Sequence, residues 1–132
     1  MFAGKNRLNN LTAIIDRNNI QIDGYTEDVM PLEPLRGKYE AFGWHVMDMN
    51  GHDMAEIIST LEEAKAIQEK PVCIIAHTIA GKGVSFMEKD YKWHGVPPGT
   101  SIPGEPEKEK QAKIALRELR TLEKKIEAAD ID

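Results

Sequence analysis

Several features are scarce or missing in this sequence of 132 residues, and each absence excludes a class of protein. There is one cysteine, Cys73, so the chain can form neither an internal disulfide nor a cysteine-based zinc site. No apolar run approaches the roughly 18 residues of a membrane span, and no apolar stretch of signal-peptide length follows Met1. These absences predict a cytoplasmic protein without a membrane partner.

Aromatic residues are also scarce, at 6%, and the basic residues are scattered along a chain of net charge -5. Non-specific nucleic-acid binding needs clustered Lys and Arg to displace counterions, and single-strand binding uses aromatic platforms. The composition therefore argues against a nucleic-acid partner. It favours an enzyme of small metabolites, or a part of one.

Short apolar runs alternate with helical patterns. Residues 11–15 and 72–76 are apolar, rich in β-branched residues and flanked by turn residues or proline, which predicts strands buried on both faces. Residues 44–49 alternate more and predict a third strand, and residues 34–42 and 53–69 predict helices between the strands. This order indicates an α/β fold with a partial open parallel sheet flanked by helices.

The helix at 53–69 has a specific start signal, because Asp53 can act as N-cap with Glu56 as its capping-box partner. Its apolar residues recur at helical spacing and predict one packed face, made of Met54, Ile57, Ile58, Leu61 and Ala64. Because the first strand begins so near Met1, few strands are left to flank it. Half of a domain is the simplest explanation.

The last third of the chain changes character. Residues 99–105 form a linker rich in proline and glycine, and residues 106–132 predict a C-terminal amphipathic helix. The apolar positions of this helix are Ala112, Ala115, Leu119, Leu122, Ile126 and Ala129.

A polar segment, residues 16–24, follows the first predicted strand directly. Ligands of open α/β sheets bind beyond the carboxyl ends of the strands. Asn18 offers an amide oxygen and Ile20 a backbone carbonyl, and Mg²⁺ prefers oxygen ligands of this kind. The alternative is an ordinary polar turn, since Asn, Asp and Gly dominate turns.

The run Asp-x-Asn-x-Ile-x-Ile-Asp-Gly in this segment resembles the second half of the thiamine diphosphate motif of transketolases. Further family landmarks follow in order: Phe42–Trp44, Gly51–His52, Gly81–Gly83 and Trp93–Gly95. The resemblance covers residues 1–98 and implies the C-terminal half of the diphosphate-binding domain. Because the chain ends before a pyrimidine-binding domain, it is similar to the smaller, N-terminal subunit of split transketolases.

The resemblance implies that Asn18 and Ile20 bind Mg²⁺, which holds the diphosphate of thiamine diphosphate. Ile22 is implied to press against the rings of the cofactor.

A second set of implied site residues lies further along the chain. Ala80 is implied to lie near the cofactor's rings, and Gly81 and Lys82 belong to a turn whose backbone can approach a phosphate. His94 is implied to contact the diphosphate and the bound sugar, and it is the candidate catalytic residue. Without the resemblance, a lone loop histidine reads as a surface or packing residue.

The sequence contains no Gly-Asp-Gly, which is the first half of the family motif. The resemblance therefore implies two partners, namely a chain or segment that carries Gly-Asp-Gly and a pyrimidine-binding domain or subunit. Sugar phosphates are the implied substrates. We expect the isolated chain to bind thiamine diphosphate and Mg²⁺ weakly, to be inactive, and to self-associate through exposed apolar surface.

The function implied is that of part of a transketolase, which transfers a two-carbon ketol unit between ketose and aldose phosphates. Two alternatives stay open. One is a non-catalytic fragment or assembly element, and the other is 1-deoxyxylulose-5-phosphate synthase, which shares the Gly-Lys-Gly turn.

Overall fold

The computed structural model describes the backbone of residues 1–129 and the side chains of residues 1–121. The chain forms two compact units. Unit 1 comprises Met1–Asn18 and Met30–Thr78, and unit 2 comprises Asn19–Val29 and the chain from Ile79 onward. No helix in the described part is both long and apolar enough to cross a membrane. The domain boundaries expected from the sequence stay a prediction.

Unit 1 contains a parallel sheet of three strands, β1 (Thr12–Arg17), β4 (His45–Asn50) and β5 (Val72–His77). Their order is β1-β5-β4, so β5 is central and its residues 72–76 are all buried. The predicted strands and the parallel α/β class are confirmed. The carboxyl ends of all three strands lie at one edge of the sheet.

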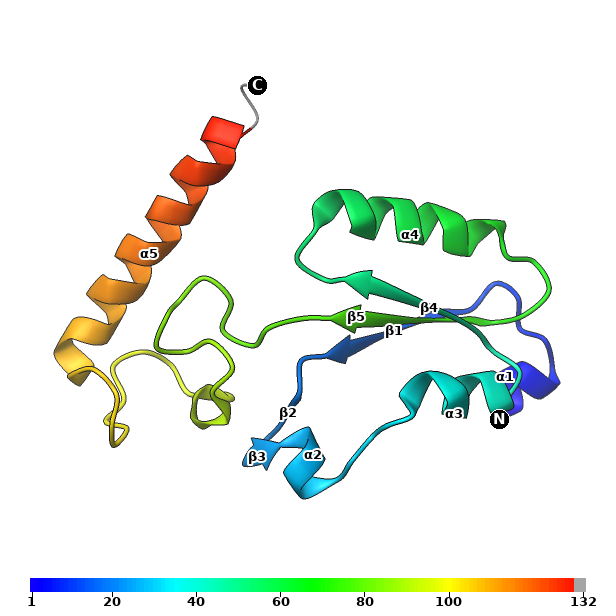
Figure 1. Cartoon of the computed structure of the whole chain (residues 1–132), viewed down its shortest axis with the longest axis horizontal. Coiled ribbons are helices and arrows are strands. Elements are labelled where there is room, and N and C mark those ends of the chain that lie inside the picture. Colours follow the sequence, from blue (N-terminus) through cyan, green and yellow to red (C-terminus); the bar gives the residue numbers. More distant parts are fainter. Residues whose placement is uncertain (130–132) are drawn as a thin grey trace. The chain divides into compact units, whose positions relative to one another are not determined.

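Helices cover both faces of this sheet (Figure 1). Helix α4 (Met54–Ala66) packs on one face, whose core is Met47, Met49, Ala64, Val72, Ile74 and Ala76. Helix α3 (Leu35–Ala41) lies on the other face, whose core is Leu35, Val46, Cys73 and Ile75. The short helix α1 (Phe2–Lys5) lies next to the end of α3.

Strand β1 departs from the prediction that it is buried on both faces. It is an edge strand among the described residues, paired with β5 alone, and Ile14 is 55% exposed. Its register partner in the central strand, Ile74, is 0% exposed. An apolar run therefore identified the strand correctly, whereas its burial depends on its place in the sheet.

Helix α4 also differs from its prediction in detail. Asp53 caps it, because its side chain accepts from the backbone N–H groups of Ala55 and Glu56. The predicted capping box is wrong. It would need Glu56 to accept from the N–H of Asp53, but Glu56 Oε1 accepts from the N–H of Asn50 at 2.9 Å. The helix ends at Ala66, not Glu69. On its predicted apolar face, Ile57, Leu61 and Ala64 pack against the sheet, whereas Met54 and Ile58 are exposed because they lie at its margin.

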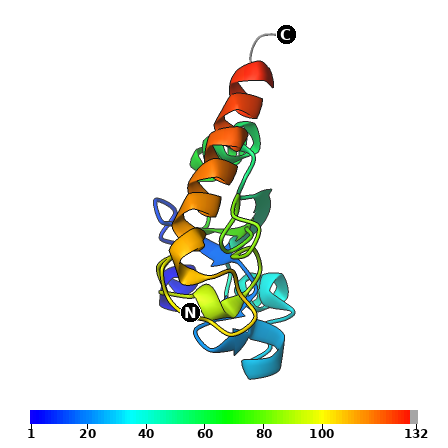
Figure 2. The same cartoon turned by 90° about the vertical axis from the view of Figure 1, so that its left-hand side faces the viewer.

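Unit 2 is built from short elements that the sequence did not predict, followed by one long helix. Strands β2 (Ile20–Gln21) and β3 (Gly24–Tyr25) form an antiparallel hairpin, and α2 (Thr26–Val29) follows. A single 3-10 turn, η1 (Tyr91–Trp93), precedes the proline-rich linker, and α5 (Lys108–Ala129) ends the described part. Figure 2 shows α5 as one uninterrupted helix, which confirms the predicted C-terminal helix.

The packed side of α5 is not the one expected. Ala115 is buried as predicted, but Ala112 is exposed and Leu119 is 40% exposed. The cause is Gln111, which is fully buried and bonds the linker: it accepts from Gly99 N at 2.7 Å and donates to Thr100 O at 3.0 Å. Leu122, Ile126 and Ala129 lie outside the residues whose side chains are described.

Gly4 provides a test of the packing between α1 and α3. A Cβ added to Gly4 would collide with the backbone carbonyl oxygen of Phe42, which has no rotamer by which to move aside. We therefore expect Gly4→Ala to lower the free energy of unfolding by about 1–3 kcal/mol. Urea titration followed by circular dichroism measures the change.

Gly37 in α3 is the matched control for this substitution. A Cβ at Gly37 would meet only side-chain carbons of Pro34 at 3.9 Å, an ordinary contact. Because Ala is favoured over Gly inside a helix by about 1 kcal/mol, Gly37→Ala is expected to be neutral or stabilising. Equal stability of the two variants would contradict the contact between Gly4 and Phe42.

Candidate functional site

The first group of site residues lies at the carboxyl edge of the sheet in unit 1. Asp16, near the end of β1, accepts a hydrogen bond on Oδ1 from the hydroxyl of Thr78, which follows β5. Its Oδ2 accepts from Asn18 Nδ2 at 3.2 Å. The predicted ligand Asn18 is therefore tied, through Asp16, to the residue that follows the central strand.

A charged cluster lies at the same edge. Asp48 of β4 accepts from His77 Nε2 at 2.9 Å and forms an ion pair with Arg36 of α3. Burial alone would raise the pKa of Asp48, but the bonds from His77 and Arg36 outweigh it, and the net pKa is lowered. Burial, with the nearby charge of Asp48, raises the pKa of Cys73 to about 11. This thiol therefore stays protonated at neutral pH and is a poor nucleophile.

The hairpin of unit 2 carries two more predicted residues. Ile20 pairs with Tyr25 across the hairpin, and Ile22 lies in its turn with φ +39. A β-branched residue rarely adopts positive φ, so the backbone at Ile22 is strained. Its side chain is 64% exposed. The turn thus presents an apolar side chain outward, and the predicted contact of Ile22 with a ligand's rings stays a prediction.

A cavity of about 190 Å³ lies within unit 2 and gathers four predicted site residues. Ile20, Ala80, Gly81 and His94 all line it, although they come from distant parts of the sequence. The remaining lining residues are Met87, Asp90, Trp93 and Gly95. The structure therefore brings four of the predicted site residues to one space, and their roles stay predictions.

The turn at Gly81 has the backbone form that requires glycine. Its φ is +73, and an added Cβ would lie 2.5 Å from the carbonyl oxygen of Met87. Lys89 N donates to Ala80 O at 2.9 Å and closes this loop. Glycine is therefore required at position 81, because its backbone lies directly against the carbonyl of Met87.

Lys82 does not line the cavity. Its Nζ lies 3.5 Å from Glu88 Oε1, and that same oxygen accepts from Gly83 N at 2.9 Å. The bond from Gly83, with the charge of Lys82, lowers the pKa of Glu88. Lys82 therefore holds the turn together in this structure, and its predicted role in cofactor binding stays a prediction.

His94 follows η1 and is exposed, whereas its neighbour Trp93 is 6% exposed. The Trp93 ring packs against Phe86 with ring centroids 5.0 Å apart, and Tyr91 packs against Tyr25 of β3 at 5.2 Å. The Tyr91 contact holds η1 against the hairpin, and the Trp93 contact holds it against the segment that contains Phe86. His94 follows η1 directly and lines the same cavity as Ile20.

Asn18 and Ile20, the two predicted metal ligands, offer oxygen atoms, and their binding of a metal ion stays a prediction. Within the described residues, no group of three or more His, Cys, Asp or Glu side chains is placed to hold a metal ion. Asn18 donates through its amide nitrogen to Asp16, so its amide oxygen is not the atom that faces this carboxylate. A neutral amide oxygen and the Ile20 carbonyl suit Mg²⁺, which takes further oxygens from water and phosphate.

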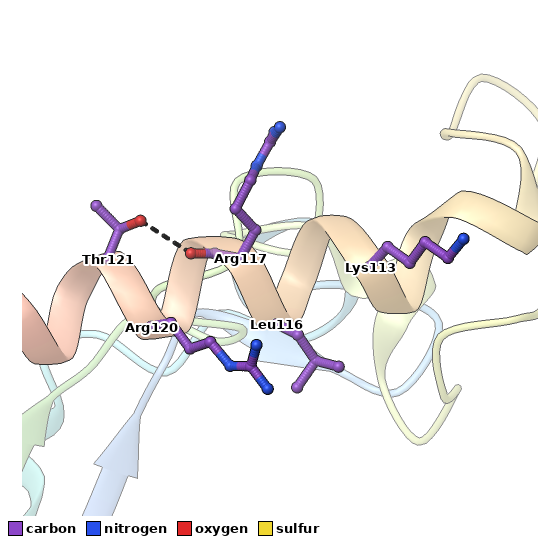
Figure 3. Close-up of a pocket in the computed structure, with 5 residues that line it drawn as sticks. All are labelled: Lys113, Leu116, Arg117, Arg120 and Thr121. Atoms are coloured by element: carbon purple, nitrogen blue, oxygen red, sulfur yellow. Dashed lines mark hydrogen bonds between the residues drawn. The ribbon is translucent and has the colours of Figure 1, made fainter.

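A larger cavity, of about 380 Å³, lies along α5 (Figure 3). Its lining residues occupy one face of the helix: Lys113, Leu116, Arg117, Arg120 and Thr121. The Thr121 hydroxyl donates to the backbone carbonyl of Arg117 at 2.9 Å. Three cations give this face positive charge, but none of the site residues found in the sequence lies on it. We therefore assign the candidate site to the smaller cavity.

Sequence reasoning named Trp93 and Gly95 only as landmarks beside His94, and it missed Met87 and Asp90 altogether. Asp90 carries a recognisable local signal, because it caps η1 by accepting from Lys92 N at 3.0 Å. Met87 carries none, since its position follows from the close approach of the chain to Gly81.

Comparison with known proteins gives a consistent result. A family model described as the transketolase, thiamine diphosphate binding domain matches residues 1–113. The 6-deoxy-6-sulfo-D-fructose transketolase subunit SqwG of Clostridium sp. (strain MSTE9) is 51% identical over 96 residues, which cover 73% of this chain and 35% of that protein. An apulose-4-phosphate transketolase subunit of Phocaeicola vulgatus is 51% identical over 98 residues, with coverage of 74% and 35%.

Solved structures agree with these relatives. The crystal structure of transketolase from Campylobacter jejuni superposes with a TM-score of 0.65 and 38% identity, covering 69% of this chain and 14% of that one. The chain spans about a third of the length of the two subunits named above. Because the family model matches most of the sequence, this chain belongs to the transketolase family, within its thiamine diphosphate binding domain.

Proposed function

We propose that this chain is part of a transketolase that moves a two-carbon ketol unit from a ketose phosphate to an aldose phosphate, using thiamine diphosphate and Mg²⁺. The observation that carries the proposal is the cavity of unit 2, which brings together Ile20, Ala80, Gly81 and His94. Membership of the transketolase family supports the same reaction class.

Each residue of the site has a distinct part in this proposal. The Asn18 amide oxygen and the Ile20 carbonyl would hold Mg²⁺, and backbone N–H groups of the turn at Gly81 would bind the diphosphate. Ala80 and Ile22 lie against the cofactor's rings. Bound thiamine diphosphate supplies stabilisation of the carbanion that forms when the ketol unit leaves its donor sugar.

His94 is the residue proposed to act on the reacting groups. Its imidazole can donate a hydrogen bond to a diphosphate oxygen, or pass a proton to and from a sugar hydroxyl near neutral pH. Its exposed position at the cavity's lining suits contact with an incoming substrate. The buried Trp93 beside it keeps the backbone at this position fixed.

Two partners complete the proposal. A chain or segment carrying Gly-Asp-Gly supplies the acidic metal ligand that this sequence does not contain, and a pyrimidine-binding domain or subunit completes the site. Until they are present, we expect the chain to be inactive and to self-associate through exposed apolar residues such as Phe2 and Met54. The names of the two relatives as subunits are consistent with such an assembly.

The two alternatives from the sequence differ in what they predict. A non-catalytic assembly element would show no binding of thiamine diphosphate, with or without the partner segments. A 1-deoxyxylulose-5-phosphate synthase would also use thiamine diphosphate but would not transfer a ketol unit from a ketose phosphate. The relatives named above are transketolases or their subunits, which favours ketol transfer.

Titration calorimetry with thiamine diphosphate and Mg²⁺ tests the proposal, first on the chain alone and then with a Gly-Asp-Gly segment of a related transketolase added. We expect no measurable binding by the chain alone and binding once the segment is present. Asn18→Ala should weaken that binding, whereas Asn10→Ala, at an exposed asparagine before β1, should not. Failure of the mixture to bind, with both parts folded by circular dichroism, would overturn the proposal.

A further inference from the structure

A series of contacts at the carboxyl edge of the sheet connects all three strands to Asn18. Gly51 follows β4, and its N–H donates to the carbonyl of His77 at 2.9 Å. A Cβ at Gly51 would collide with the γ-methyl of Thr78, so this methyl lies directly on Gly51. With its methyl fixed against β4, Thr78 turns its hydroxyl toward β1, where it donates to Asp16 Oδ1.

Asp16 then determines how the Asn18 amide is turned. A carboxylate accepts hydrogen bonds and has none to donate, whereas an amide donates only through its nitrogen. The Asn18 nitrogen, 3.2 Å from Asp16 Oδ2, therefore faces the carboxylate, because the opposite orientation would place two acceptors together. The Thr78 hydroxyl occupies the other carboxylate oxygen and limits rotation of the Asp16 side chain.

We propose that Asp16 and Thr78 are positioning residues that present the amide oxygen of Asn18 to the metal ion. This inference rests on the proposed function, in which Asn18 is a ligand of Mg²⁺. Hydrogen bonds behind a metal ligand fix its orientation, and their loss typically lowers metal affinity by about 10–100-fold. Thr78 is neutral, so Asp16 is the charged member of this network.

A purely structural network makes a different prediction. If the hydrogen bonds of Asp16 served only to hold the ends of β1 and β5 together, their loss would lower the free energy of unfolding and leave metal affinity unchanged. The two roles are separated by Thr78→Val, which keeps the methyl on Gly51 and removes the hydroxyl, and by Thr78→Ser, which keeps the hydroxyl. Thr12→Val, at the opposite end of β1, is the matched control.

The test uses Mn²⁺ as a probe in place of Mg²⁺, with thiamine diphosphate and the chain assembled with the Gly-Asp-Gly segment. Electron paramagnetic resonance of free Mn²⁺ gives the affinity. We expect Thr78→Val to weaken Mn²⁺ binding about 10-fold and Asp16→Ala up to about 100-fold. Thr78→Ser and Thr12→Val should bind as the unchanged chain does.

A second readout is independent of the metal. In the free, isotope-labelled chain, the NMR signals of the Asn18 side-chain NH₂ should move in Thr78→Val and Asp16→Ala and stay in place in Thr12→Val. Unchanged Mn²⁺ affinity in Thr78→Val and Asp16→Ala, with normal binding by the original assembly, would overturn this inference alone. Absence of Mn²⁺ binding by the original assembly would overturn the proposed function, and this inference with it.

Discussion

Replacing Ile74 with alanine is expected to lower the free energy of unfolding by about 2–5 kcal/mol, the usual range for large-to-small changes in a core. Ile74 is 0% exposed in the central strand, and it packs in the core that α4 covers. A close-packed interior relaxes only partly around a deleted group, so both the lost burial and the cavity add to the cost. Urea denaturation, followed by circular dichroism, measures the difference.

Ile14 supplies the control for this prediction. It is the same residue type, it is the direct register partner of Ile74 in the neighbouring strand, and it is 55% exposed. Because exposed substitutions usually change stability by about 0.5 kcal/mol or less, Ile14→Ala should unfold close to the original midpoint. Similar losses in both variants would mean that β5 is not the central strand of the unit.

These two isoleucines also show how far the sequence could predict the fold. The apolar runs that contain them were each recognised as strands, because β-branched residues between turn formers carry that signal locally. The local sequence of each strand does not show which strand is central in the sheet. The order β1-β5-β4 follows from crossover connections, and only that order makes Ile74 buried and Ile14 exposed.

The residues of the candidate site also differ in how far the sequence could predict them. The resemblance to transketolases implied roles for Ile20, Ala80, Gly81 and His94, and the structure brings these four to one cavity. Met87 could not be predicted, because its position depends on the close approach of two loop segments. Contacts between distant residues are set by the fold, so motifs find the residues of a site more readily than they find the residues that support it.

Replacing His94 with alanine is expected to lower kcat/KM for ketol transfer by about 10²–10⁴-fold in the assembled enzyme, the range of one general acid–base group. His94 lines the cavity while remaining exposed, so no core packing is lost on truncation. The free energy of unfolding should therefore change by about 0.5 kcal/mol or less. A steady-state assay with a ketose phosphate donor and an aldose phosphate acceptor measures the first effect, and urea denaturation measures the second.

His52 is the matched control, since it is also an exposed histidine after a structural element but belongs to unit 1, in the turn between β4 and α4. His52→Ala should keep kcat/KM within about threefold of the original, because a residue without a part in the chemistry contributes no transition-state stabilisation. If His94→Ala were equally active, His94 would have no role in catalysis, and the cavity would serve cofactor binding alone. If both variants lost activity together, the effect would come from the assembly of the enzyme, because the two histidines share neither a structural unit nor a cavity lining.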